Sequence, residues 1–204
     1  AALLAGRRVA VVALVVLAGV VHPTTGIWLA VVAGVGLAVA HRGWRPWVLA
    51  AGGLAAVLGA WALLAGPLSP RLVRMDTEWL SVLASKRYLF PDRWPATEWL
   101  VAAAYVLVIA LAYRVRRRRG LASLHETGLV CGIGALALVF AASLPLNAAR
   151  VAFFVQLQVP RVLWLMDLVA VAYLVWLFAE GSKGGDQQAG SRRALAVALA
   201  ILAL

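Results

Sequence analysis

Apolar residues occur along this chain in long, nearly unbroken runs, and short polar breaks separate one run from the next. The runs lack the alternation of polar and apolar side chains that a transmembrane β-barrel requires. An apolar run of about 20 residues can cross a bilayer as a helix, because a helix satisfies its own backbone hydrogen bonds. The pattern therefore predicts an all-α, polytopic bundle of transmembrane helices.

Six such runs precede a polar connector, and we expect a helix in each. They cover residues 9–21, 27–40, 47–66, 99–113, about 128–146 and 162–179. The first two are short for a full crossing, which fits thin, tilted or half-inserted helices. The connector at 181–193 leads to a final apolar run, 194–204, which we expect to be a truncated seventh span. We expect residues 1–204 to form one transmembrane domain within a longer protein.

Composition agrees with a membrane protein. Apolar residues make up 64% of the chain and charged residues 13%, against about half and a quarter in soluble domains. The formal net charge of +11 comes mainly from basic clusters at the ends of apolar runs, where they set topology and meet anionic lipid headgroups. We therefore expect membrane lipids as partners and no nucleic acid. Cys131 stands alone in an apolar run, so we expect no disulfide, no metal site and no cofactor.

Lysine and arginine are divided unevenly between the two predicted sides of the membrane. Twelve of the nineteen lie on the side that holds the N-terminal end of the chain, and seven lie on the other. The richer side is expected to be cytoplasmic. Residues 67–98 would then be an extracytoplasmic loop of a plasma (inner) membrane protein, and residues 181–193 a cytoplasmic linker.

The stretch 67–98 concentrates charged residues between two apolar runs. At 100° per residue, five apolar side chains of residues 69–90 share one face, namely Leu72, Met75, Trp79, Val82 and Leu83. This periodicity predicts an interfacial amphipathic helix with Ser69 as its N-cap. Asp76 projects beside the apolar stripe, where a carboxylate is costly unless it is paired or used. It is therefore either a salt-bridge partner or a catalytic or ligand-binding residue.

Basic and aromatic side chains follow at the same boundary. The candidate residues in this group are Arg87, Tyr88, Asp92, Arg93 and Trp94. Arginine side chains suit phosphate and carboxylate groups, but an ordinary boundary anchor has the same composition. His22 ends the first apolar run beside Pro23, where it could act as a general base or as a polar cap of the next helix.

The connector 147–161 is apolar enough to dip into the membrane, and its few polar side chains include Arg150, Gln158 and Arg161. Asp167 lies about two turns into the sixth run. An acidic side chain at that depth indicates a functional site, and we expect it to pair with Arg150 or Arg161.

Small residues at helical spacing favour close packing of helices. Gly128 and Gly132 are four residues apart in the fifth run, and Gly52, Ala56 and Gly59 lie along the third. In a chain this rich in alanine and glycine, chance also produces such spacing.

Three segments carry a resemblance: HPTTGIW, SKRYLFPDRWP and FFVQLQVPRVLWLMD. They resemble polytopic bacterial membrane proteins of unassigned activity, which in turn resemble GT-C glycosyltransferases and the related O-antigen ligases and polymerases. The resemblance covers about residues 20–165. It implies an enzyme that takes a sugar from a polyprenyl-phosphate carrier at the outer face. That class commonly carries an acidic pair in its first outer loop, and the HPTTG turn has none.

The resemblance also implies roles for the candidate residues. Arg87, Arg93, Arg150 and Arg161 would hold phosphate oxygens. Asp76, Asp92 or His22 would activate the acceptor hydroxyl. Two other functions remain open: a transporter, which would use polar groups near the bilayer midplane such as Asp167, and a non-catalytic membrane component.

Overall fold

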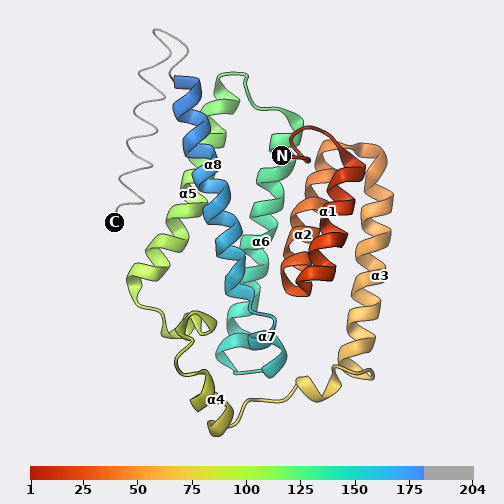
Figure 1. Ribbon diagram of the computed structural model, residues 1–204, viewed down its shortest axis with the longest axis vertical. Helices are drawn as coiled ribbons and strands as arrows, with labels where there is room; N and C mark the ends of the chain where they lie inside the picture. Colours follow the sequence, from red (N-terminus) through yellow and green to blue (C-terminus); the bar gives the residue numbers. More distant parts are fainter. Residues whose placement is uncertain (182–204) are drawn as a thin grey trace.

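The structure is a computed structural model that describes residues 1–181, and these residues form an all-α bundle, as predicted (Figure 1). Its α-helices are α1 (Arg8–Val21), α2 (Pro23–Ala40), α3 (Arg45–Leu64), α4 (Thr77–Leu83), α5 (Ala96–Arg118), α6 (Leu124–Ala148), α7 (Ala152–Gln156) and α8 (Val162–Gly181). Short 3-10 turns are η1 (Arg42–Trp44), η2 (Ser69–Arg71), η3 (Arg87–Leu89), η4 (Pro91–Arg93) and η5 (Val159–Arg161). The expected linker beyond Gly181 and the last apolar run lie outside the described residues.

Five stretches of the described chain are long and apolar enough to cross a membrane. They are Pro23–Ala40, Arg42–Leu64, Ala96–Arg118, Leu124–Ala148 and Ala152–Glu180. α1 is apolar but has only 14 residues, about 21 Å of helix at 1.5 Å per residue. The chain is therefore a multi-pass membrane protein with five candidate spans, and α1 does not reach the length of a sixth.

The two ends of the bundle hold different chain segments (Figure 1), and these segments differ in their basic residues. One end, which we call the arginine-rich end, gathers Arg7, Arg8, Arg42, Arg45 and residues 114–119. The opposite end, which we call the loop end, holds residues 65–95 and 149–161, including α4 and α7. Within residues 1–181, the basic residues of the two groups counted along the sequence thus lie at opposite ends of the bundle. Which end faces the cytoplasm stays a prediction.

The main core lies between α2, α5, α6 and α8. Its buried side chains include Trp28, Val108, Leu136, Val162, Met166 and Leu177. A smaller apolar cluster at the loop end joins residues from three segments: Met75, Leu89, Phe90, Ala152 and Val155. The second cluster fixes the loop segments to the end of the bundle, although they contain little regular structure.

α2 and α6 pack with their backbones in contact because glycines line the interface. A Cβ atom on Gly128 would lie 2.5 Å from the carbonyl oxygen of Gly36, and one on Gly132 would lie 2.5 Å from the carbonyl oxygen of Val32. These distances are too short for any side chain. The packing role predicted for Gly128 and Gly132 is confirmed.

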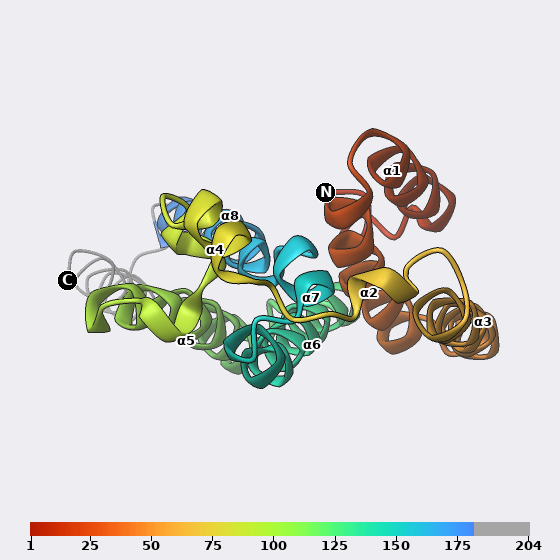
Figure 2. The ribbon, with the colours of Figure 1, turned by 90° about the horizontal axis from the view of Figure 1, so that it is seen from below.

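The small residues of α3 do not contact another helix in this way. It has no buried residue, and a Cβ atom on Gly52 or Gly59 would meet nothing within 4 Å in the described part of the chain. Figure 2 shows α3 at the edge of the bundle, on the far side of α2 from α5 and α8. Within residues 1–181, the spacing of small residues in the third run therefore serves no helix packing.

The continuous helix predicted over residues 69–90 is wrong in extent. The regular structure there consists of η2, the seven-residue α4, and η3. Ser69 is the first residue of η2 rather than its N-cap, which is Leu68 and makes no side-chain hydrogen bond. Instead, the backbone at Asp76 is extended, and its carboxylate accepts a hydrogen bond from the Trp79 backbone N–H at 2.7 Å. Asp76 therefore starts a new helix as an N-cap.

A tertiary contact explains why the helix does not form. Residues 73–75 pair through their backbones with the chain that leaves α6. Arg74 and Val151 form an isolated antiparallel bridge. The Ala152 N–H donates to the Val73 carbonyl at 2.9 Å, and the Met75 N–H donates to the Arg150 carbonyl at 2.9 Å. Backbone groups that a helix would pair internally are thus used between two segments.

Candidate functional site

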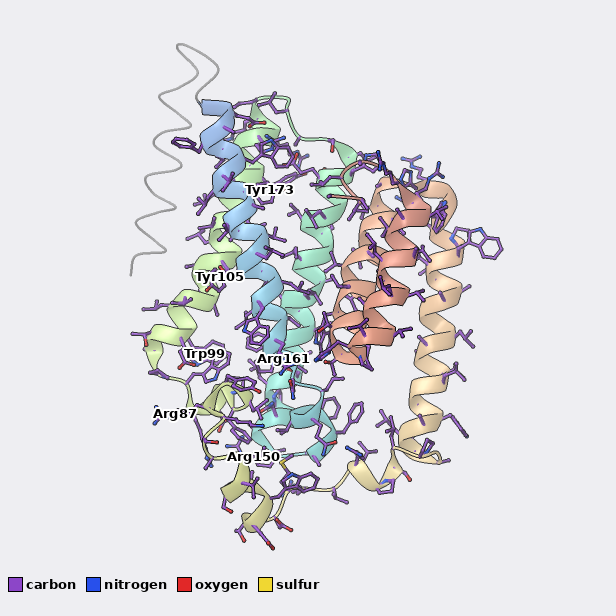
Figure 3. The ribbon with its side chains drawn as sticks, viewed as in Figure 1. Arg87, Trp99, Tyr105, Arg150, Arg161 and Tyr173 are labelled. Atoms are coloured by element: carbon purple, nitrogen blue, oxygen red, sulfur yellow. The ribbon has the colours of Figure 1, made fainter. Side chains whose placement is uncertain are left out.

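A cavity of about 300 Å³ opens near the loop end, between the first turns of α5 and α8. Its lining residues are Tyr88, Trp94, Thr97, Glu98, Val101, Ala102, Tyr105, Pro160, Arg161, Leu163 and Trp164. Most of these side chains are aromatic or aliphatic, and only Glu98 and Arg161 carry charge. Figure 3 shows Tyr105 on the α5 side and Arg161 at the start of α8. An apolar cavity with few polar groups is the usual form of a small-molecule site.

The Arg161 guanidinium is anchored at this cavity by two neighbours. One terminal nitrogen lies 3.1 Å from Nε2 of His22, and the guanidinium carbon lies 5.2 Å from the centre of the Trp164 ring. The Arg161 Nε atom is buried and has no hydrogen-bond partner among the described residues. The guanidinium is therefore held in place while part of its donor capacity is unused.

His22 connects this arginine to the start of α2. It is the N-cap residue of α2, and its Nδ1 lies 3.3 Å from the Thr25 backbone N–H. The same Nδ1 lies 2.9 Å from the Thr24 hydroxyl and 3.1 Å from the Thr25 hydroxyl. The polar-cap role considered for His22 is confirmed. Because Nε2 faces Arg161, a catalytic role remains a prediction that this geometry accommodates.

Arg150 and Asp92 form a two-point ion pair outside the cavity. The two distances are 2.8 and 2.6 Å, and the Arg150 guanidinium lies over the Phe90 ring at 4.8 Å. Hydrogen bonding from Arg150 holds the pKa of the Asp92 carboxyl below its usual range, although partial burial opposes the shift. Arg150 itself has φ 57°, the left-handed region that is rare for residues other than glycine. The pair thus ties η4 to the α6–α7 connector.

The other predicted site residues are spread over the loop end. Tyr88 and Trp94 line the cavity, and Trp94 Nε1 donates to the Arg87 carbonyl at 3.2 Å. The Arg87 side chain is exposed, and the Arg93 guanidinium lies over Phe90 at 5.6 Å. Among the predicted residues, the structure brings together His22, Arg161, Tyr88 and Trp94, and it leaves Asp76 and Asp92 in separate contacts.

Gln158 and Asp167 flank Arg161 along the chain. Gln158 has φ 52°, and its buried Oε1 lacks a hydrogen-bond partner in residues 1–181. The ion pair predicted between Asp167 and Arg150 or Arg161 is wrong, because Arg150 pairs with Asp92 and Arg161 contacts His22. Asp167 instead lies within electrostatic range of Tyr105 on α5.

Sequence reasoning missed the α5 side of the cavity. Thr97, Glu98, Val101 and Tyr105 recur at spacings of one, three and four residues and so share one face of a helix. The sequence shows Glu98 as a charged residue directly before the apolar run 99–113. Its direction toward Arg161 and Trp164 depends on how α5 and α8 pack.

A second polar cluster, also missed, lies buried at the arginine-rich end. Arg116 donates to both carboxylate oxygens of Glu126 at 2.9 and 3.2 Å, and it also pairs with Glu180. The Tyr173 hydroxyl donates to Glu126 at 3.1 Å. The guanidinium lies 3.5 Å from the centre of the Trp176 ring. Arg116 belongs to a basic run that the sequence indicated only as a topology signal.

Within the described residues, no group of three or more His, Cys, Asp or Glu side chains lies close enough to hold a metal ion. Comparisons with protein-family models, with curated proteins and with solved structures gave no match to this chain. The cavity between α5 and α8 and the side chains around it are therefore the features of this chain that bear on its function.

Proposed function

We propose that this membrane protein binds an amphiphile with a phosphate-containing headgroup in the α5–α8 cavity. The observation that carries the proposal is the position of Arg161, whose anchored guanidinium borders a mainly aromatic and aliphatic cavity between two candidate spans. The aliphatic and aromatic lining suits a hydrocarbon chain. A guanidinium with unused donors suits a phosphate oxygen.

We further propose that the ligand is a polyprenyl-phosphate-linked sugar and that the protein transfers the sugar to an acceptor hydroxyl. In this reaction the bond between the anomeric carbon and the phosphate oxygen breaks, and a bond to the acceptor oxygen forms. The phosphate leaves on its lipid carrier, and a base takes the acceptor proton. His22 is the first candidate for that base, because it contacts Arg161, whereas Asp76 caps α4 and Asp92 pairs with Arg150.

The proposed reaction takes place at the outer face of the membrane. The distribution of lysine and arginine supports this orientation, since the arginine-rich end would remain in the cytoplasm. In this arrangement α1 enters the membrane as a short additional segment.

The proposal is tested by replacing Arg161 and a matched arginine. Farnesyl-phosphoryl glucose, a short analogue of the proposed ligand, is titrated into the protein in lipid nanodiscs, and tryptophan fluorescence reports binding because Trp94 and Trp164 line the cavity. Arg161→Ala should weaken binding about 10- to 100-fold, since a hydrogen bond to a charged group contributes about 1.5–3 kcal/mol. Arg74→Ala should bind as the wild type does, because Arg74 is exposed and lies outside the cavity.

An uncharged farnesyl glucoside serves as the ligand control and should bind more weakly than the phosphodiester. Equal binding of the two ligands, or equal binding by wild type and Arg161→Ala, would contradict the proposal. Transfer is then measured as glucoside formation on an added acceptor in the same nanodiscs, and Arg161→Ala should lower its rate at subsaturating donor.

A second candidate function is transport of the amphiphile across the bilayer. Asp167 favours it, because this carboxylate lies on α8 within electrostatic range of Tyr105, while Arg150 pairs with Asp92 and Arg161 contacts His22. Polar groups at membrane depth are typical of transport pathways. Asp167→Asn should slow the exchange of a fluorescent lipid phosphate between leaflets of vesicles, whereas it should leave headgroup binding unchanged.

A further inference from the structure

We infer that the α5–α8 cavity binds a zwitterionic headgroup, with a phosphate at Arg161 and a positively charged amine at Glu98 and the neighbouring aromatic rings. The inference rests on the proposed function, because it specifies the chemical class of the headgroup that the same cavity binds. All the side chains that carry it line the cavity, namely Tyr88, Trp94, Glu98, Tyr105 and Arg161.

Two opposite charges border this cavity from different elements. Arg161 belongs to η5, and Glu98 lies in the first turn of α5. The ion pairs formed within residues 1–181 join Arg116 to two glutamates and Arg150 to Asp92. No ion pair therefore joins Glu98 to Arg161, and the cavity presents a positive and a negative group that do not neutralise each other.

The Glu98 carboxylate disfavours a ligand that carries only negative charge. A phosphate bound at Arg161 would share the cavity with this carboxylate and would be repelled by it. A ligand with an amine beside its phosphate matches both charges, so that the repulsion is replaced by attraction. Because the Glu98 side chain is exposed, solvent screens this attraction and keeps its effect on affinity moderate.

Aromatic rings supply the second partner for an amine, since a cation is attracted to the face of a ring. The Trp164 ring already lies 5.2 Å from the guanidinium carbon of Arg161. Tyr88, Trp94 and Tyr105 are the other aromatic residues of the lining. The indole N–H of Trp94 donates to a backbone carbonyl of η3 at 3.2 Å, which holds this ring in place.

Two kinds of lipid have this headgroup chemistry. An amino sugar on a polyprenyl phosphate places an amine a few bonds from a phosphodiester, and so does the phosphoethanolamine headgroup of a phospholipid. The first would be the sugar donor of the proposed reaction, with its amine used for recognition only. The experiment therefore includes both.

The test compares farnesyl-phosphoryl glucosamine, which has a free amine, with farnesyl-phosphoryl glucose. Both are titrated at pH 6 into the protein in nanodiscs of phosphatidylglycerol, whose headgroup carries no amine, and tryptophan fluorescence reports binding. Wild type should bind the amine about 3- to 30-fold more tightly, the combined effect of a partly screened ion pair and a cation–π contact. The N-acetylated glucosamine ligand, which has no charge on nitrogen, should bind about as the glucose ligand does.

Glu98→Gln should move the two ligands in opposite directions. The amine ligand should bind about 2- to 5-fold more weakly, because the ion pair is lost. The glucose ligand should bind as tightly as to wild type or more tightly, because the repulsion of its phosphate is removed. Damage to the fold would instead weaken both. Glu78→Gln is the matched control, since Glu78 is exposed on α4 and lies outside the cavity, and it should leave both affinities unchanged.

The outcomes separate this inference from the proposed function. Equal affinity of wild type for the two ligands, with binding that still depends on Arg161, would overturn the zwitterionic headgroup and leave the proposed function standing. A full preference for the amine in Glu98→Gln would also overturn it. No binding of either ligand would overturn both. Competition by added phosphatidylethanolamine, with the same sensitivity to Glu98→Gln, would support the zwitterionic headgroup and refute the sugar in the proposed function.

Discussion

Arg116 with Glu126 and Arg150 with Asp92 are both two-point arginine–carboxylate pairs, but they occupy opposite ends of the bundle and different surroundings. The side chains of the first pair are 3% and 1% exposed, and those of the second are 16% and 36% exposed. The first pair is joined by Glu180, Tyr173 and the Trp176 ring. The arginine-rich end thus contains a connected, buried polar network, whereas the loop end contains a partly exposed ion pair.

The two ends also differ in the number of buried polar atoms that lack a hydrogen-bond partner. In the described part of the chain, buried side-chain atoms without a hydrogen-bond partner near the loop end belong to Trp28, Asn147, Gln158 and Arg161, and at the arginine-rich end to Glu180. Buried polar groups without partners are costly. The loop end thus holds more buried polar groups without a protein partner than the arginine-rich end does, and Arg161 beside the cavity is one of them.

The largest expected effect is the loss of stability when the buried network is broken. Glu126→Ala leaves the Arg116 guanidinium buried, with only Glu180 to compensate it, and should lower the free energy of unfolding by about 3–5 kcal/mol. Glu78→Ala, an exposed change in α4, should stay within about 0.5 kcal/mol. Unfolding in mixed SDS micelles measures both. Equal losses of stability in the two variants would show that the buried network does not stabilise the arginine-rich end more than an exposed residue stabilises the loop end.

A smaller effect should follow from crowding the α2–α6 interface beside that network. Gly128→Ala places a Cβ atom 2.5 Å from the Gly36 carbonyl oxygen and should cost about 1–3 kcal/mol, because the helices must separate. Gly134→Ala lies on the same helix with nothing within 4 Å in the described residues and should be neutral. The same SDS unfolding assay compares them, and similar losses for both would argue against the close packing.

The smallest loss of stability is expected when the partly exposed ion pair between Arg150 and Asp92 is broken. Asp92→Asn should lower the free energy of unfolding by about 0.5–1 kcal/mol, because solvent screens a partly exposed pair. Arg150 lowers the pKa of the Asp92 carboxyl in the folded state. The contribution is therefore complete above the unfolded-state pKa of about 3.9 and is lost as the pH falls through the lower folded-state value.

The control for this pH effect uses the geometry of the pair. Arg150→Lys keeps the positive charge but cannot donate two parallel hydrogen bonds, so it should keep part of the acid sensitivity. Asp92→Asn should remove it. Stability profiles between pH 7 and pH 3 distinguish the variants, and identical acid sensitivity in wild type and Asp92→Asn would show that another carboxylate is responsible.

Much of the fold was predictable because it depends on local composition. The helices over Pro23–Ala40, Arg45–Leu64 and Ala96–Arg118 follow from apolar runs whose backbones must pair internally in lipid. The close approach at Gly128 and Gly132 also followed from spacing. The same spacing in α3 had no such outcome, because a small residue permits a close contact without creating the partner helix.

The sequence by itself determined that this chain is an all-α, multi-pass membrane protein. It also determined that the polar residues gather in the short segments between apolar runs. Only the tertiary structure decided which of those residues meet. His22 reaches Arg161, Asp92 reaches Arg150 and Arg116 reaches Glu126, and residues 73–75 pair with the connector after α6 instead of continuing a helix. The physical reason is that hydropathy acts residue by residue along the chain, whereas a hydrogen bond between distant segments depends on how whole helices pack.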